Sequence, residues 1–170
     1  LSCSSAASDV YKRQDKAKKQ LDEISPTMCY AKWSQVSMHL TNGKTHSCYH
    51  PPTHSIDVNE LKTNPSALHN TKEKKEQRAL MLKGERPEGC SYCWRIEDVG
   101  GRSDRVYRSG EYWAQNAKEE IKQAGWEGNI NPRYVEVNFN QACNLKCSYC
   151  SPHLSNCLLY TSPSPRDDPL

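Results

Sequence analysis

The sequence predicts an α+β fold in which a cysteine-rich module of short helices and strands precedes one further strand. Asn42-Gly43 is a strong hairpin signal between two segments that read as strands. Two helical segments end at Gly84 and Gly125, and glycine commonly follows the last turn of a helix. The alternating segment YVEVNF then predicts a strand over 134–139.

The expected elements follow in order along the chain. Residues 15–26 form a polar helical lead that Pro26 ends. The remaining patterns predict a strand over 31–40, a return strand over 45–49, a loop over 50–54, a helical turn over 58–61, a helix over 66–82, a cysteine-bearing turn over 86–94, a helix over 111–124 and the strand over 134–139.

Composition indicates a soluble protein with a modest core. The 170 residues are 35% hydrophobic and 25% charged, with a single Phe, so we expect metal sites to contribute to the stability of the fold. No segment has the length of a membrane span or the pattern of a signal peptide, which predicts a cytoplasmic protein with no membrane partner.

Both termini differ in character from the rest. Residues 4–14 (SSAASDVYKRQ) and 157–167 (CLLYTSPSPRD) match in-frame translations of transposase-type sequencing adapters. We therefore expect 1–14 and 157–170 to be non-native, extended or irregular, with few contacts to the middle. Excluding Cys3 and Cys157 from the nine cysteines leaves seven.

The formal net charge of +3 is too small to imply a nucleic-acid partner. One basic run lies in the expected helix 66–82 and contains Lys72, Lys74, Lys75 and Arg78. It predicts a solvated helix face, with a phosphate-binding or partner surface as the alternative.

Three cysteines, Cys143, Cys147 and Cys150, stand in the segment CNLKCSYC directly after the strand 134–139. Three thiolates in one tight loop can hold three corners of a 4Fe–4S cluster and leave the fourth iron open for chemistry. Zinc or plain core thiols are the alternative, but zinc prefers paired C-x2-C knuckles, and this set would need a distant fourth ligand.

The motif closely resembles that of radical S-adenosylmethionine (SAM) enzymes, and Asn144, Leu145 and Lys146 match common choices in this family. The resemblance implies that the open iron chelates SAM, that an electron from a donor such as flavodoxin or ferredoxin cleaves it, and that the resulting radical abstracts hydrogen from a substrate. Tyr149 matches the position that packs near the adenine of SAM. The substrate stays open among peptides, sugars and small metabolites.

A second set consists of Cys29, Cys48, Cys90 and Cys93. Its spacing resembles the twitch (half-SPASM-like) module of radical SAM proteins, which implies an auxiliary 4Fe–4S cluster. The similarity continues through Arg78, Met81, Glu97, Ser103 and Arg105. A structural zinc site on the same residues is the alternative. His46, His50 or His54 could replace a thiolate, whereas a disulfide framework fits poorly with seven cysteines at metal-type spacing.

The resemblance implies an α+β twitch-like module followed by the start of an incomplete (β/α) radical SAM barrel. The expected organisation is a non-native segment 1–14, a lead 15–26, the module 27–100, a helical linker 101–133, the first barrel strand and cluster loop 134–156 and a non-native segment 157–170. We expect this fragment to be inactive alone. The alternatives are a zinc-ribbon binding module, for nucleic acid among other partners, and a non-catalytic electron-transfer protein.

Overall fold

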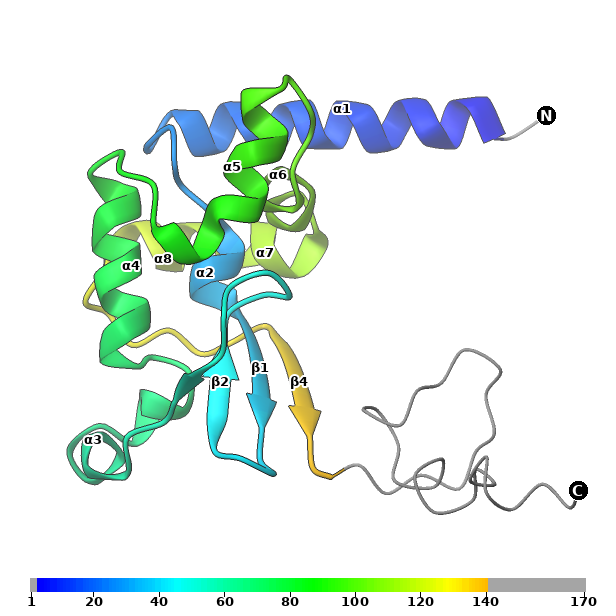
Figure 1. Cartoon of the computed structure of the whole chain (residues 1–170). Helices are drawn as coiled ribbons and strands as arrows, with labels where there is room; N and C mark the ends of the chain where they lie inside the picture. The colour runs from blue at the N-terminus through cyan, green and yellow to red at the C-terminus, as the bar shows by residue number, and fades with distance from the viewer. Residues whose placement is uncertain (1–2, 141–170) are drawn as a thin grey trace, which may run out of the picture.

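The computed structural model describes residues 3–140, and shows a mixed α/β fold with a small open sheet (Figure 1). The elements are α1 (Cys3–Asp22), α2 (Tyr30–Ser34), β1 (Gln35–His39), β2 (Lys44–His46), β3 (His54–Ser55), α3 (Val58–Thr63), the 3-10 helix η1 (Pro65–Leu68), α4 (Lys72–Leu82), the 3-10 helix η2 (Glu88–Cys90), α5 (Ser91–Asp98), α6 (Asp104–Ser109), α7 (Tyr112–Asn116), α8 (Lys118–Ala124) and β4 (Tyr134–Asn138).

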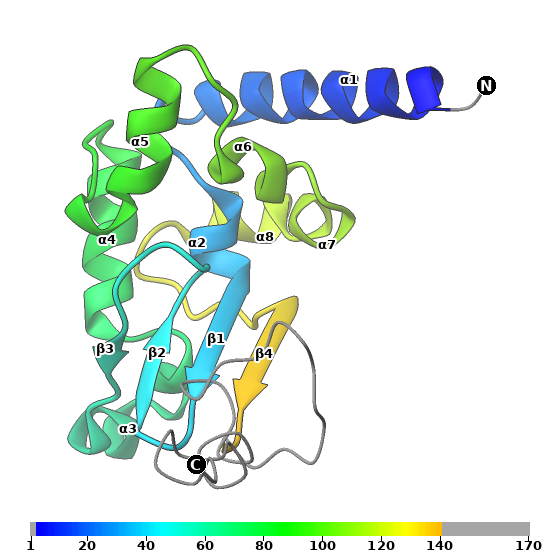
Figure 2. The same cartoon turned by 45° about the vertical axis from the view of Figure 1, so that its right-hand side comes forward.

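The four strands form one sheet in the order β3-β2-β1-β4 (Figure 2). β1 and β2 are antiparallel and flank the expected turn, where Gly43 adopts a φ of 64° that favours glycine. β4 pairs in parallel with β1, with Ser37 opposite Glu136, and no strand among residues 3–140 pairs with its other side. The strand expected over 134–139 is confirmed over Tyr134–Asn138.

The strand expected over 31–40 is wrong in its first half, because Tyr30–Ser34 is helical and only Gln35–His39 is extended. All five residues of α2 are buried. A helix buried on every side has no polar face, so hydrophobic periodicity cannot distinguish it from a buried strand. The tertiary surroundings decide the conformation here.

The N-terminal segment is also not extended as expected. Residues 3–14 belong to the 20-residue helix α1, which continues through most of the expected polar lead and ends at Asp22, before Pro26. Near its C-terminal end Ala17 and Leu21 are buried, and Arg102 forms an ion pair of 2.9 Å with Asp15. The N-terminal half of α1 projects beyond the rest of the fold (Figure 1). Residues 3–14 thus continue a helix whose last turns are packed against the fold.

Two other expected helices are interrupted. The helix expected over 66–82 divides into η1 and α4, because the Thr71 side chain accepts a hydrogen bond from the Lys74 backbone and starts a new helix. The helix expected over 111–124 divides into α7 and α8 at Ala117. Two short helices, α5 and α6, occupy a region where only a turn and a break were expected.

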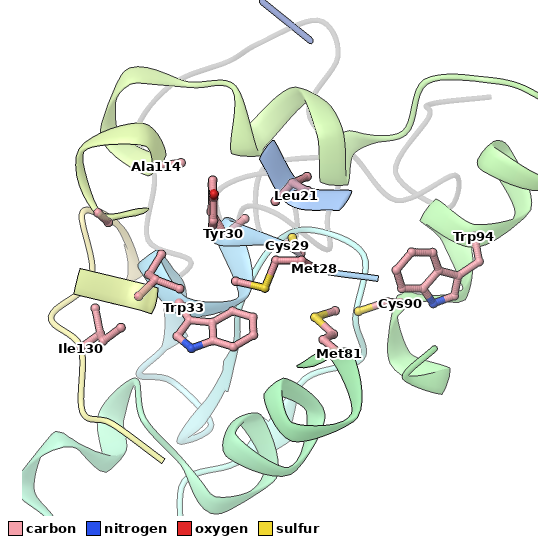
Figure 3. Close-up of a cluster of buried hydrophobic side chains, with 13 residues drawn as sticks. Leu21, Met28, Cys29, Tyr30, Trp33, Met81, Cys90, Trp94, Ala114 and Ile130 are labelled. Atoms are coloured by element: carbon pink, nitrogen blue, oxygen red, sulfur yellow. The ribbon is translucent and has the colours of Figure 1, made fainter. Parts of the chain in front are cut away.

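The core surrounds α2 on the helical side of the fold. Trp33 is fully buried, and its indole nitrogen donates a hydrogen bond of 2.8 Å to the Gly125 carbonyl. Figure 3 shows Trp33 beside Ile130, and Met81 between Trp33 and Cys90. Trp94 is also buried, so both tryptophans are core aromatics.

We predict that Trp33→Ala destabilises the protein by about 3–5 kcal/mol, because it removes a fully buried indole and leaves the Gly125 carbonyl unpaired. Trp126, which is 40% exposed, provides the matched control, and Trp126→Ala should cost roughly 1 kcal/mol or less. Urea denaturation of both variants measures the difference. Equal losses would show that α2 is not central to the core.

Candidate metal centre

Four cysteines from three separate segments of the chain line a single cavity. Cys29 precedes α2, Cys48 lies in the loop after β2, Cys90 ends η2 and Cys93 lies in the first turn of α5. All four are free thiols. The cavity therefore brings together the complete second set that the sequence singled out.

Local structure explains how the pair in C-x2-C faces the same side. The Cys90 backbone donates a hydrogen bond of 3.0 Å to the Pro87 carbonyl, which starts the helical turn. Residues three apart on such a turn share a face, so Cys90 and Cys93 point the same way. Figure 3 shows Cys90 between Met81 and Trp94, with Cys29 nearby.

Cys48 comes from the loop that connects β2 and β3. The His46 ring hydrogen-bonds through Nδ1 to the Cys48 carbonyl, and His50 Nε2 lies 2.7 Å from Asp104 Oδ2. His50 also stacks on Tyr92 of α5, with ring centroids 3.8 Å apart. These contacts hold the loop against α5 and α6.

Burial suppresses ionisation of Cys29, Cys48 and Cys93. It raises the pKa of Cys29 to about 12 and the pKa of Cys93 to about 11, and neighbouring thiols add to both shifts. Burial likewise raises the pKa of Cys48, which Lys32 opposes. A metal must therefore displace protons from these thiols, so its binding is coupled to pH.

The donor set fits a metal centre by its chemistry. Four thiols of three separate segments within electrostatic reach of one another suit either a 4Fe–4S cluster or tetrahedral zinc. Among residues 3–140 no three His, Cys, Asp or Glu side chains lie close enough to hold one ion. The four sulfurs line the cavity, but they are too far apart to bind one ion together. A zinc ion, which binds sulfur at about 2.3 Å, would require them to move inward.

One wall of the cavity is held by a buried ion pair. Arg105 lines the cavity, and its guanidinium binds Glu97 at 2.7 and 2.9 Å and the Met28 carbonyl at 2.6 Å. Ser103 donates a further hydrogen bond to Glu97. Three of the residues named in the twitch resemblance thus form one network that positions the segment preceding Cys29.

Of the three histidines considered as ligands, the structure brings only His50 to the cavity. His46 contacts His39 instead, with 3.0 Å between the two Nε2 atoms. His54 Nε2 lies 2.9 Å from Thr71 Oγ1. Each ring is already engaged by another group.

The expectation of a solvated face for the basic run is wrong for two of its members. Lys74 and Arg78 are buried on α4, whereas Lys72 is exposed. Arg78 stacks over Trp33 at 5.5 Å and donates a hydrogen bond of 2.9 Å to Asn70. Lys74 and Arg78 are four residues apart, so they lie on the same face of α4, and this face packs against the core.

The first cysteine set, Cys143, Cys147 and Cys150, and the proposed adenine contact Tyr149 lie outside the described residues. β4 ends at Asn138, shortly before them. Its C-terminal end points away from the helices around the four-cysteine cavity (Figures 1 and 2).

Sequence analysis missed Lys32 and Asp104 as lining residues of the cavity. Lys32 is 2% exposed and belongs to a helix that is buried on all sides. The sequence pattern of this helix does not indicate that its lysine faces inward. Asp104 is paired with a histidine that lies 54 residues away in sequence. Only the tertiary structure shows these two contacts.

The chain matches no protein-family model, no curated protein and no solved structure. Within the described residues, none of the helices combines the length and the apolar character needed to cross a membrane. The twitch and radical SAM assignments therefore remain proposals that rest on the motifs and on the cavity.

We predict that Glu97→Gln destabilises the protein by about 3 kcal/mol at pH 7, because it leaves the buried Arg105 guanidinium without its carboxylate. Burial alone would raise the pKa of Glu97, but hydrogen bonds from Arg105 and Ser103 lower it below the ordinary 4.5. The carboxylate therefore stabilises the fold above about pH 4.5, and this contribution disappears as the pH falls through the lowered pKa.

Denaturation curves at pH 7 and at pH 3.5 measure this effect, and the gap between wild type and Glu97→Gln should narrow at the lower pH. Glu127→Gln, at an exposed position on the same protein, is the control and should show no comparable gap. A gap that is independent of pH would contradict the ion-pair explanation.

Proposed function

We propose that this chain is part of a radical SAM enzyme, and that its N-terminal module binds an auxiliary iron–sulfur cluster through Cys29, Cys48, Cys90 and Cys93. The observation behind the module's role is the meeting of all four cysteines at one buried cavity. The four thiols are separated by as many as 64 residues in sequence, and a common metal ligand would account for their position around one cavity.

The proposal for the catalytic cluster rests on the spacing of Cys143, Cys147 and Cys150 and on the strand before them. β4 is a short strand at the sheet edge, parallel to β1, with Val135 half exposed. A parallel edge strand that leads into a ligand loop is the arrangement expected at the start of a β/α barrel. The free edge of β4 is where a following parallel strand would pair.

When bound, the iron–sulfur cluster and SAM supply the radical chemistry. The residues of this chain would bind and orient these groups and shield them from water. Cys29, Cys90 and Cys93 are each less than 8% exposed, so the protein excludes water from the auxiliary centre. Met81 and Trp94 cover the thiols with apolar surface, and Arg105 fixes the wall beside Cys29.

The same proposal includes a cytoplasmic location and a small electron carrier, such as flavodoxin or ferredoxin, as a partner. Its support is the free state of the four described cysteines, since a reducing compartment keeps thiols available for metals. The substrate class stays open among peptides, sugars and small metabolites, and neither a membrane nor a nucleic acid is part of the proposal.

We predict that the full chain, reconstituted anaerobically with iron and sulfide, loses about half of its iron when Cys143, Cys147 and Cys150 are all replaced by Ala, since each cubane contains four irons. Iron and sulfide assays with the visible absorbance measure the loss. The matched control replaces Cys3 and Cys157 by Ala, which should leave the iron content unchanged. An unchanged iron content in the triple variant would refute the catalytic cluster.

The double variant Cys90→Ser, Cys93→Ser should lose the other half of the iron, because it removes two of the four ligands of the auxiliary centre. Metal analysis by mass spectrometry distinguishes the alternatives. One zinc per chain that disappears in this variant would establish the zinc site in place of the auxiliary cluster. No metal lost on this change would mean that the four thiols are only core residues.

A further inference from the structure

Three cationic side chains are buried near the four-cysteine cavity. Lys32 is 2% exposed, Lys74 is 1% exposed and Arg78 is fully buried. None of the ion pairs between described residues includes any of them. The described part of the chain therefore buries three basic side chains without a bonded carboxylate.

The contacts of the two lysines are neutral. Lys32 Nζ donates a hydrogen bond of 2.6 Å to the Gln77 side chain. Lys74 Nζ lies 3.5 Å from both Thr45 Oγ1 and His69 Nδ1, which is long for a hydrogen bond. Neither ammonium group has the anionic partner that a buried charge normally requires.

Arg78 increases this imbalance. Its Nε contacts the Lys32 carbonyl at 3.3 Å, and its Nη2 is buried without a partner among the described residues. Burial, then Arg78 and Lys32, lower the pKa of Lys74 well below its usual range, and Cys48 and Glu73 oppose this shift. Glu73 is half exposed, so water screens its charge from the buried lysine.

Besides Asp104, which is paired with His50, the four cysteines are the acidic groups that line this cavity. Lys32 lines the same cavity as Cys48, and it lowers the pKa of that thiol against the effect of burial. Four thiolates around one zinc ion, or around an oxidised cubane core, leave a net charge of about −2. Either centre would supply the negative charge that the buried cations lack.

We infer that Lys32, supported by Lys74, is the electrostatic counterpart of the metal centre at Cys29, Cys48, Cys90 and Cys93, and that it favours the more reduced, more negative state of a cluster bound there. This inference rests on the proposed auxiliary centre. Lys32 is a tuning residue and not a metal ligand. Reduction adds one negative charge to the centre, and a nearby cation in a medium of low dielectric stabilises that charge.

The test uses the full chain with Cys143, Cys147 and Cys150 replaced by Ala, so that only the auxiliary centre contributes. In this background Lys32→Met is compared with Lys72→Met, which removes an exposed lysine from α4, and with Lys32→Arg, which keeps the charge. For each variant we would measure the iron content and the midpoint potential in an anaerobic redox titration. We would also measure the unfolding temperature before and after loading with iron and sulfide.

We expect Lys32→Met to shift the midpoint potential to a lower value, while Lys72→Met and Lys32→Arg stay close to the parent protein. The rise in unfolding temperature on loading should be smaller in Lys32→Met, because the apoprotein no longer contains that unpaired buried charge. A merely structural lysine would lower both unfolding temperatures equally. If Lys32→Met does not fold, Lys74→Met tests the inference instead. We expect it to shift the midpoint potential in the same direction.

Two results overturn different claims. Normal iron content with the same potential in Lys32→Met and Lys72→Met would refute the role of Lys32 and leave the auxiliary cluster intact. If neither iron nor zinc depends on the four cysteines, the auxiliary centre itself is wrong. If the thiols bind zinc, the affinity measured by chelator competition should fall about tenfold or more in Lys32→Met and stay unchanged in Lys72→Met.

Discussion

The burial of helix α2 is the constraint on which the arrangement of the whole fold depends. This five-residue helix is covered on every side, and it joins Cys29 at its start to β1 at its end. Its Trp33 donates a hydrogen bond to the Gly125 carbonyl at the C-terminal end of α8. The position of the thiol cavity and the direction of the sheet are thus both set by one short, fully packed element.

Buried thiols and buried basic side chains lie close together around this helix. Burial raises the pKa of Cys29, Cys48 and Cys93, which favours their neutral form, whereas Lys32 and Arg78 bring basic groups into the same region. A fold with this imbalance gains from any ligand that converts the thiols into thiolates. The structure of the module is therefore consistent with a metal centre that is part of its stability as well as its chemistry.

The cavity and the edge strand lie in different parts of the fold. The four cysteines line the cavity among α2, α5 and the loop after β2, while β4 runs away from these helices (Figure 2). The parallel pairing of β4 with β1 connects the two parts through one continuous sheet.

The sequence by itself determined the turn at Gly43 and the strand of residues 134–138, because turn chemistry and alternation are local properties. It also grouped the four cysteines, through a spacing that resembles the twitch module, and all four line one cavity. Only the tertiary structure decided that Tyr30–Ser34 is helical and that Lys32 faces the cavity. Both depend on what surrounds a segment on all sides. Hydrophobic periodicity reveals a helix or a strand when one face is polar and the other apolar. It cannot distinguish the two when both faces are buried.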